Sequence, residues 1–432
     1  MRRYGKQECC FVYYWHMTII IPILTALHLH MPSGINQTSG LPVKKVVILG
    51  GGIAGVAAAI AFRKRGFEVE VISDREYLFI YPIAIWIPVG TEEFKNVAFP
   101  LEKFARKHGF SLTIDKVTAI DTTRDSITLE KGGIRSDFDF AVIALGSGKM
   151  KHEGIEHTLS ICGAPEQTLR LREKIDALVE RGHGKIAFGF GGNPKDPSGV
   201  RGGPGFELFF NLHHKLTRLG IRDNFEMTFF APMAQPGAKM GRKALDMMAK
   251  MFKQKNFRQR YGKKITRFEA DGVVFEDGGK LQSDLTMFIP AGSGHSVVKA
   301  SDLPLSEAGF VRIDDFCRVV GVDGWYAVGD SAALEGPDWK AKQGHIAEFM
   351  AECAANNCAA EHLGHEEPMK GYQEHLNVLC VMDTGDGAGF VYRTGHSEMF
   401  IPMPVVGHWL KKVWGYYYKL SKMKYIPRIP GM

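Results

Sequence analysis

Residues Lys44–Ser73 read KKVVILGGGIAGVAAAIAFRKRGFEVEVIS, and this stretch decides the fold. The apolar run 46–49 predicts a buried parallel strand, residues 54–62 predict a helix of small side chains, and FEVEVIS predicts the next strand. Gly50, Gly52 and Gly55 fit the pattern G-x-G-x-x-G between strand and helix. Such glycines permit a tight turn, let the backbone approach a pyrophosphate and allow the helix to pack closely on the strand. The stretch therefore predicts a dinucleotide-binding βαβ unit.

Residues around this unit are expected to hold the dinucleotide. Ile53 and Ala54 open the helix, whose N–H groups and positive dipole end favour phosphate. An acid that binds the ribose is expected about 20 residues after the glycines, where Ser73 and the slightly later Asp74 stand. Residues 77–100 are aromatic and rich in proline, which predicts a loop over the ligand that brings Pro82 to the cofactor.

Two later segments indicate which dinucleotide is bound. The segment VIALGSG, 142–148, contains Gly146 and resembles the turn at which FAD-dependent oxidoreductases with two dinucleotide-binding domains leave the flavin domain. The segment YAVGDSAA, 326–333, contains Gly329 and Asp330 and resembles their second flavin motif, whose acid binds the ribityl chain of FAD. The three motifs occur in the family's order, so the resemblance implies FAD as the cofactor.

Within that superfamily, residues 43–425 resemble the sulfide:quinone oxidoreductases. Four segments carry this likeness: LSICGAPEQTLRLREKI from 159, GGPGFELFFNLHHKL from 202, KAKQGHIAEFMAE from 340 and HLNVLCVMDTGDGAGF from 375. The resemblance implies that Cys162 and Cys380 match redox cysteines of the family. It also implies that Lys342 and Gly344 meet the pyrimidine end of the flavin and that quinone lies beside Phe390 and Tyr392. His345 and Glu348 are candidate proton carriers, with structural roles equally expected.

One position departs from the family pattern. The family usually has a cysteine shortly before the Gly-Pro-x-Phe-Glu segment, and here Arg201 stands in its place, with no cysteine between 163 and 316. Sulfide oxidation needs a sulfur group that accepts the attacking sulfide and a thiolate that passes on two electrons. Three alternatives follow: Cys162 pairs with Cys380, the enzyme uses a single reactive thiolate, or the substrate differs. A guanidinium at residue 201 could lower the pKa of a nearby thiol or hold an anionic sulfur substrate.

A second glycine-rich strand end raises the alternative of a type II NADH:quinone oxidoreductase. Residues 184–192 read GKIAFGFGG and look like the start of another nucleotide site. Pro194 and Pro197 follow, and they disfavour the helix that would bind the phosphates of NADH. A third alternative is a flavin-binding redox sensor or assembly factor without turnover. Sulfide oxidation with transfer of electrons through cysteine and FAD to quinone is the leading prediction.

Composition limits the classes further. The chain has 432 residues, 45% of them hydrophobic and 23% charged, so it can form two or three domains with a sizeable core. A net charge of +7 without a basic, aromatic-interleaved run in the body of the chain argues against nucleic acid as a partner. The seven cysteines are scattered and contain no Cys-x-x-Cys pair, so no metal site is expected.

The C-terminal residues 400–432 contain no Asp or Glu and alternate lysines with Trp and Tyr. The stretch is too short and too basic to span a bilayer, and it predicts an interfacial helix whose lysines meet anionic lipid. We therefore expect a peripheral, monotopic protein of a prokaryotic plasma membrane. The alternative is a helix docked on the protein or on a second subunit of a homo-oligomer.

The predicted fold class is α/β, with two Rossmann-like domains as in glutathione-reductase-like flavoproteins and a membrane-associating C-terminal region. Residues 43–150 and 285–350 are assigned to the FAD-binding domain, 151–284 to the second domain and 351–432 to a quinone and membrane region. Residues 1–42 form an extension with a basic start and an apolar run of about 20 residues, which fits a membrane anchor, a signal peptide or an over-extended start.

Overall fold

The computed structural model describes residues 43–366 and 368–427. Contacts separate the chain into two units, Met1–Pro42 and Val43–Met432. The predicted anchor, signal peptide or over-extended start therefore lies outside the described residues. All the elements below belong to the second unit.

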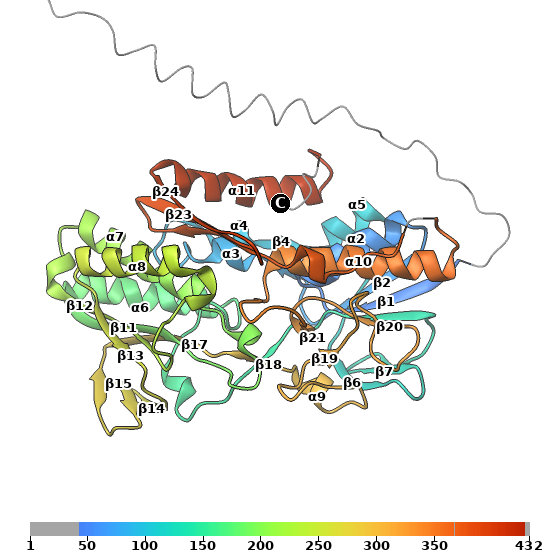
Figure 1. The fold of residues 1–432 in the computed structure, drawn as a ribbon, viewed down its shortest axis with the longest axis horizontal. Helices are drawn as coiled ribbons and strands as arrows, with labels where there is room; N and C mark the ends of the chain where they lie inside the picture. Colours follow the sequence, from blue (N-terminus) through green and yellow to red (C-terminus); the bar gives the residue numbers. More distant parts are fainter. Residues whose placement is uncertain (1–42, 367, 428–432) are drawn as a thin grey trace, which may run out of the picture. The chain divides into compact units, whose positions relative to one another are not determined.

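Five strands form a parallel sheet in the order β20-β9-β1-β2-β5 (Figure 1). They are β1 (Lys45–Leu49), β2 (Glu68–Ser73), β5 (Ser111–Ile114), β9 (Phe140–Ile143) and β20 (Trp325–Ala327). The chain passes from β1 to β2 on one side, while β9 lies on the other side, so the strand order reverses at β1. Ligands of open parallel sheets bind at such a switch point, beyond the carboxyl ends of the strands. The glycine turn 50–55 follows β1 directly and lies at this point.

Helix α2 (Ile53–Lys64) connects β1 to β2 and packs along α10 (Gly344–His362), as Figure 1 shows. Both helices bury runs of alanine, which allow a close approach. At Gly329 the backbone has φ +66°, and a Cβ built there would lie 2.8 Å from the Cβ of Ala54 and 3.2 Å from that of Ala347. Small residues therefore bring the glycine turn and the segment around Asp330 together.

Four strands form a second parallel sheet in the order β13-β12-β11-β17. Its elements are α6 (Gln167–Arg181), β11 (Gly184–Phe190), α7 (Gly203–Arg218), β12 (Phe225–Ala231), α8 (Arg242–Gln254), β13 (Arg258–Tyr261) and β17 (Leu285–Ile289). The domain boundary predicted between 284 and 285 is wrong, because β17 pairs with β11 along its whole length and Phe288 stacks on Phe230 in this core. The second sheet extends to Ile289.

The segment 77–100 is not a loop over the ligand, and that prediction is wrong. It forms β3 (Tyr77–Phe79), α3 (Tyr81–Ala84), α4 (Phe94–Val97) and β4 (Ala98–Pro100). Residues 83–87 are buried, and Nε1 of Trp86 donates a hydrogen bond to Asp383 at 2.5 Å. Phe79, Trp86 and Phe99 are therefore core residues, and Trp86 fastens this segment to the C-terminal region.

Three strands near the C-terminus form an antiparallel sheet, β22 (Val378–Asp383), β23 (Gly387–Arg393) and β24 (Glu398–Pro404). Helix α11 (Val406–Lys422) lies against β23 and β24 (Figure 1). A Cβ built at Gly407 would lie 2.5 Å from the Cβ of Ala388, so α11 covers the sheet face that carries Ala388. None of the helices in the described residues is both long enough and apolar enough to cross a membrane.

The other described elements are short and complete the two lobes. The strands are β6 (Val117–Asp121), β7 (Ser126–Leu129), β8 (Gly133–Arg135), β10 (Gly148–Lys149), β14 (Ile265–Glu269), β15 (Gly272–Phe275), β16 (Lys280–Gln282), β18 (Gly292–Ser293), β19 (Val311–Arg312) and β21 (Ala332–Ala333). The helices are α5 (Leu101–His108), α9 (Ser296–Lys299) and the 3₁₀ turns η1 (Ile155–His157), η2 (Pro197–Gly199), η3 (Arg222–Asn224), η4 (Ala238–Met240), η5 (Gly329–Ser331) and η6 (Gln373–His375).

Candidate active site

The glycine turn has the geometry of a phosphate cradle. Gly50 has φ +114°, and a Cβ on it would lie 2.4 Å from the carbonyl oxygen of Ala144 at the end of β9. A Cβ on Gly55 would lie 1.8 Å from the carbonyl oxygen of Gly50. At Gly52, by contrast, a Cβ would meet nothing within 4 Å, and this residue caps α2, whose first turn opens with Ile53 and Ala54. The open space in front of the first-turn N–H groups fits a pyrophosphate.

This difference gives a paired prediction for two glycines. Gly55→Ala places a methyl group inside the turn, so we expect a loss of folded protein or a lower melting temperature. Gly52→Ala meets only open space, so we expect the protein's stability without cofactor to be unchanged but its affinity for FAD to fall about tenfold or more, because the methyl group takes the place of the phosphate. Thermal unfolding of flavin-free protein and equilibrium titration with FAD measure the two effects. Equal FAD affinity in Gly52→Ala and the parent would contradict the assignment of the cradle.

Ser73 and Asp74 have different roles at the end of β2. Ser73 is buried, and its Oγ donates to the carbonyl of Arg75 at 2.7 Å while accepting from the N–H of Arg75 at 3.2 Å. Its side chain therefore supports the turn. The carboxylate of Asp74 is 65% exposed and lies 3.5 Å from the guanidinium of Arg75, which leaves it accessible to a ribose.

The other flavin motifs meet at the same switch point. Gly146 has φ +75°, and a Cβ there would meet nothing within 4 Å. The Ser331 hydroxyl donates to the carbonyl of Gly146 at 3.1 Å and so ties the two motifs together. The carboxylate of Asp330 forms an ion pair with Arg201. The residues expected to bind FAD from separate parts of the sequence thus meet at one switch point, and the open space at Gly52 and Gly146 fits that cofactor.

Lys342 lies beside this region and is buried. Its Nζ donates to the carbonyl of Ala332 and lies 4.0 Å from the ring centroid of Phe310. Burial lowers the pKa of Lys342 to about 7. Gly344 is the first residue of α10 and approaches Ile53, while Pro82 lies in α3 and is partly buried.

The two predicted redox cysteines are free thiols. Cys162 is buried, and its N–H donates to Oγ of Ser160 at 3.3 Å. Burial raises the pKa of Cys162, against the charges of Lys149 and Arg201. Cys380 lies in β22, and burial followed by the charge of Glu207 raises its pKa to about 12.

Glu207 contacts Cys380, and its negative charge is among the causes that raise the pKa of both thiols. Its Oε1 lies 4.0 Å from Sγ of Cys380, and its two oxygens accept from Nζ of Lys411 at 2.5 Å and 2.6 Å. Burial raises the pKa of Glu207 to about 7, although Lys411 opposes the shift. The sequence motif that contains Glu207 was recognised, but nothing in the sequence indicated its contact with Lys411, which is 204 residues away.

The loop between β11 and α7 differs from a second phosphate cradle. Residues 191–202 separate the strand from the helix, and they contain the turn η2 rather than a helix start. Asn193 donates to the carbonyl of Gly292 at 2.9 Å, and Asp196 caps η2 by accepting from the N–H of Ser198 at 2.8 Å. A Cβ built on Gly202, the N-cap of α7, would lie 2.6 Å from the ring of Phe190 at the end of β11, so the helix start packs on the strand end although twelve residues separate them in the chain.

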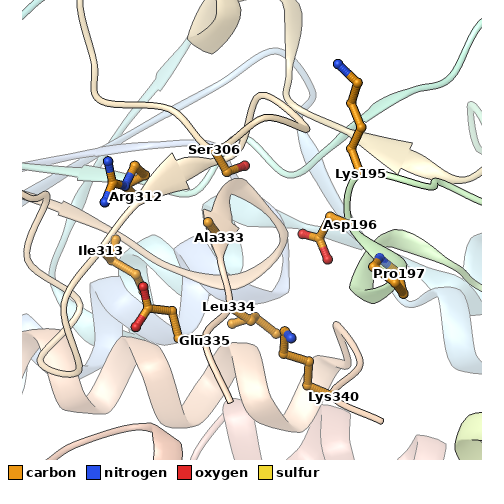
Figure 2. A pocket seen from close by; sticks show the side chains of 10 residues that line it. All are labelled: Lys195, Asp196, Pro197, Ser306, Arg312, Ile313, Ala333, Leu334, Glu335 and Lys340. Carbon is orange, nitrogen blue, oxygen red and sulfur yellow. The ribbon is translucent and has the colours of Figure 1, made fainter. Parts of the chain in front are cut away.

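This loop forms one wall of a pocket of about 260 Å³, shown in Figure 2. The opposite wall comes from β21 and the residues after it, which follow Asp330 in the chain. Three cationic side chains line the pocket, Lys195, Arg312 and Lys340, together with Asp196 and Glu335. The pocket therefore opens beside the predicted flavin site and can admit a small polar or charged molecule.

Phe390 and Tyr392 lie on β23, and the register decides which way they face. Cys380 is directly opposite Val391, while Phe390 is opposite Val381 and Tyr392 opposite Leu379. Because side chains alternate along a strand, Phe390 and Tyr392 share the face of Ala388, which α11 covers, and Cys380 is on the other face. The predicted quinone residues thus lie on the α11 side of the sheet.

Two further candidates have structural partners. The ring of His345 hydrogen-bonds through Nε2 to Oδ1 of Asn377 at 2.9 Å, and burial lowers its pKa. The buried carboxylate of Glu348 accepts from the hydroxyl of Tyr418 at 3.0 Å and pairs with Lys422 at 2.5 Å. Both contacts of Glu348 fasten α11 to α10.

Helix α11 has an exposed apolar outer face and an inner face that carries buried charges. Its outer face is apolar or aromatic, with Val406, Trp409, Val413 and Tyr416 each at least 60% exposed. Its inner face buries Lys411 and Lys422 in ion pairs with Glu207 and Glu348. The prediction that these two lysines meet anionic lipid is therefore wrong, because two buried glutamates on α7 and α10 require their charge.

Comparisons with known proteins indicate the same kind of cofactor site. The family model for pyridine nucleotide-disulphide oxidoreductases matches residues 44–351. The chain is 26% identical over 403 residues to the sulfide-quinone reductase of Aquifex aeolicus, covering 88% of this chain and 90% of that protein. It is 21% identical over 373 residues to a type II NADH:quinone oxidoreductase of Staphylococcus epidermidis, covering 81% of this chain and 90% of that one.

The solved structure of the sulfide:quinone oxidoreductase from Aquifex aeolicus superposes with a TM-score of 0.77 at 23% identity, covering 88% of this chain and 92% of that one. The predicted α/β fold and the resemblance to sulfide:quinone oxidoreductases are thereby confirmed. A match over 44–351 includes the glycine turn, Gly146 and the segment around Asp330. The chain therefore belongs to the pyridine nucleotide-disulphide oxidoreductase family and is an FAD-dependent oxidoreductase.

Proposed function

We propose that this enzyme oxidises sulfide, or a related reduced sulfur species, and passes the electrons to a membrane quinone. The observation that carries the proposal is the contact of the Cys380 thiol with the buried carboxylate of Glu207, which Lys411 of the C-terminal helix holds in place. The name of the Aquifex relative supports the same reaction. Hydrosulfide and the Cys380 thiol together lose two electrons and one proton as a persulfide forms, bound FAD would carry the electron pair, and quinone gains it with two protons, the second of which comes from water.

Residues of this chain can serve both the oxidation of the sulfur species and the reduction of the cofactor. Bound FAD would supply the two-electron carrier between sulfur and quinone. Cys380 presents a thiol that must lose its proton to react, and Glu207 Oε1 is the acceptor at 4.0 Å. A Glu207 pKa of about 7 suits both uptake and release of that proton near neutral pH. Lys342 places a cation beside the flavin motifs, where it would stabilise negative charge on a reduced cofactor.

NADH as the electron donor is the second candidate, because type II NADH:quinone oxidoreductases are also among the relatives. The loop 191–202 argues against it, since twelve residues with Pro194, Pro197 and the turn η2 replace the short glycine turn that presents helix N–H groups to the phosphates of a dinucleotide. Anaerobic addition of sulfide or NADH to the purified flavoprotein tests the choice. We expect sulfide to bleach the flavin colour within seconds and NADH to leave it unchanged. Bleaching by NADH alone contradicts the proposal, and bleaching by neither would indicate a sensor or assembly factor.

Quinones dissolve in the bilayer, so we also propose that the protein lies on a prokaryotic plasma membrane through α11 and β24. The exposed apolar face of α11, together with Met399 and Ile401 of β24, is the surface that would enter the interface. Phe390 and Tyr392, on the sheet face beneath α11, would then line the route of the quinone.

Val413→Asp puts a charge at the centre of this exposed face. We expect it to weaken binding to vesicles of phosphatidylglycerol and phosphatidylethanolamine by about tenfold or more, because it removes a buried apolar contact and adds a charge that must be desolvated. Vesicle co-sedimentation measures the effect. The matched control is Ile134→Asp on β8, whose side chain is 73% exposed and should leave vesicle binding unchanged. Equal losses in the two variants would argue against α11 as the membrane surface.

A further inference from the structure

We propose that Arg201, which replaces the usual redox cysteine, is a specificity residue that holds an anionic sulfur substrate beside Cys162. The inference rests on the proposed function and names the charge state of the substrate that the site selects. A cysteine at residue 201 would carry sulfur covalently. A guanidinium cannot form a sulfur–sulfur bond, but it binds an anion through several N–H donors.

Contacts from three segments position Arg201 at the flavin motifs. Its guanidinium pairs with Asp330 in η5. The N–H of Lys342 donates to the carbonyl of Ser198 at 3.4 Å, three residues before Arg201, and Nζ of Lys342 donates to Ala332, two residues after Asp330. The end of the loop, η5 and the segment before α10 are therefore joined, and Arg201 lies at their junction. It is not a solvated loop arginine, because its side chain is only 23% exposed.

A second cation is present on the side of Cys162. The positive charges of Lys149 and Arg201 both act on the Cys162 thiol, and they oppose the effect of its burial. Lys149 pairs with Gly292 in β10–β18, and a Cβ built on Gly292 would lie 3.4 Å from the carbonyl oxygen of Gly199, two residues before Arg201, so the two cations come from adjoining segments. Burial followed by the charge of Arg201 lowers the pKa of Lys149 to about 8. Lys149 forms no ion pair with any residue in the described part of the chain. Two close cations beside a thiol, one of them without a carboxylate partner, make a site suited to a small anion.

The hydroxyl of Tyr81, in α3, supports the segment that carries Cys162. It donates to the carbonyl of Gly163 at 3.0 Å and so holds the turn that carries Cys162. Hydrosulfide and polysulfide are anionic near neutral pH, so both fit a site of this charge. Arg201 remains charged throughout that range, and the site does not depend on deprotonating a second thiol.

Titration of the FAD-loaded, oxidised enzyme with sodium thiocyanate, a sulfur anion that does not reduce flavin, tests the inference. Binding is measured by the change in the flavin absorption bands and by protection of Cys162 from alkylation with iodoacetamide. We expect saturable binding in the parent, affinity about tenfold to a hundredfold lower in Arg201→Gln, and an intermediate value in Arg201→Lys. The matched control is Arg124→Gln, which removes the same charge from a side chain that is 83% exposed and should bind like the parent.

The outcomes separate this inference from the proposed function. If Arg201→Gln binds thiocyanate as the parent does, the inference is wrong even where sulfide bleaches the flavin. If thiocyanate binding depends on Arg201 but sulfide leaves the parent flavin oxidised, the anion site stands and the sulfide proposal fails. FAD content is measured in every variant. A variant that loses FAD but binds thiocyanate with the parent's affinity at each remaining flavin would make Arg201 a cofactor contact and overturn the inference. Arg201→Lys keeps the test available if Arg201→Gln does not fold.

Discussion

Cys380→Ala is expected to lower the rate of flavin reduction by sulfide by about 10³-fold or more, because the reaction loses the thiol that bonds the sulfur while bound FAD would accept the two electrons released. The thiol lies in β22 with Sγ 4.0 Å from Oε1 of Glu207, and no neighbouring cysteine is bonded to it. Anaerobic stopped-flow measurement of flavin absorbance after mixing with sulfide gives the rate directly. FAD content and melting temperature should stay close to those of the parent, since alanine fits in the space of a cysteine on a strand.

A matched control for this variant is Cys358→Ala in α10. Cys358 is buried like a core residue, and burial raises its pKa to about 12 as well, but its partner is Tyr326 rather than Glu207. We expect its flavin reduction to stay within about twofold of the parent, since the change removes only core packing. A Cys380→Ala variant that reduces flavin at the rate of Cys358→Ala would remove Cys380 from the mechanism and leave the family assignment intact.

The pH dependence of Cys380 alkylation adds a check that does not depend on turnover. Because the pKa of Cys380 is raised to about 12, the thiolate is a small fraction at neutral pH. Alkylation by iodoacetamide should therefore rise about tenfold per pH unit between pH 7 and 10 without reaching a plateau. A plateau near pH 8 would mean that burial and the charge of Glu207 do not raise the pKa of this thiol.

The sequence predicted the parts of the site that depend on local backbone geometry. Gly50, Gly52, Gly55, Gly146 and Gly329 were recognisable because a tight turn or a close approach excludes a side chain at particular spacings. The parallel sheet could also be predicted, because the apolar run that marks each strand lies within one short segment. Asp330 followed from its neighbours, although its pairing with Arg201 did not.

Contacts between distant segments could not be predicted in this way. The aromatic segment 77–100 has the composition of a ligand-covering loop, but Trp86 packs into the core because Asp383, almost 300 residues later, accepts its N–H. Lys411 and Lys422 have the pattern of lipid-facing lysines, and only the fold shows that Glu207 and Glu348 face them. The sequence shows which charged side chains a helix carries. Whether those side chains face solvent, lipid or the protein core depends on the elements against which the helix packs.

Breaking the Glu207–Lys411 pair is expected to have the largest effect on stability. Both side chains are buried, and the carboxylate binds the ammonium through both oxygens. At pH 8, above the pKa of Glu207, Glu207→Gln leaves the ammonium with a neutral partner, and we expect the free energy of unfolding to fall by about 3–5 kcal/mol, as for other broken buried pairs. Glu207→Gln/Lys411→Met removes both charges and should recover most of that loss, because an apolar pair needs no desolvation of charge. Urea unfolding of the parent, both single variants and the double variant gives the coupling energy.

The same pair predicts the sign of a pH effect. Burial raises the pKa of Glu207 from about 4.5 in the unfolded chain to about 7 in the folded one, so the folded protein holds a proton that the unfolded chain has released between these values. The contribution of Glu207 to stability is therefore present below pH 4.5 and is lost as the pH rises through 7. Glu207→Gln cannot titrate, and its unfolding free energy should lack this decline relative to the parent. If the two proteins have parallel pH profiles between pH 5 and 8, Glu207 stays ionised in the fold because Lys411 holds its charge. A carboxylate that stays ionised throughout this range would be too weak a base to take the proton of Cys380.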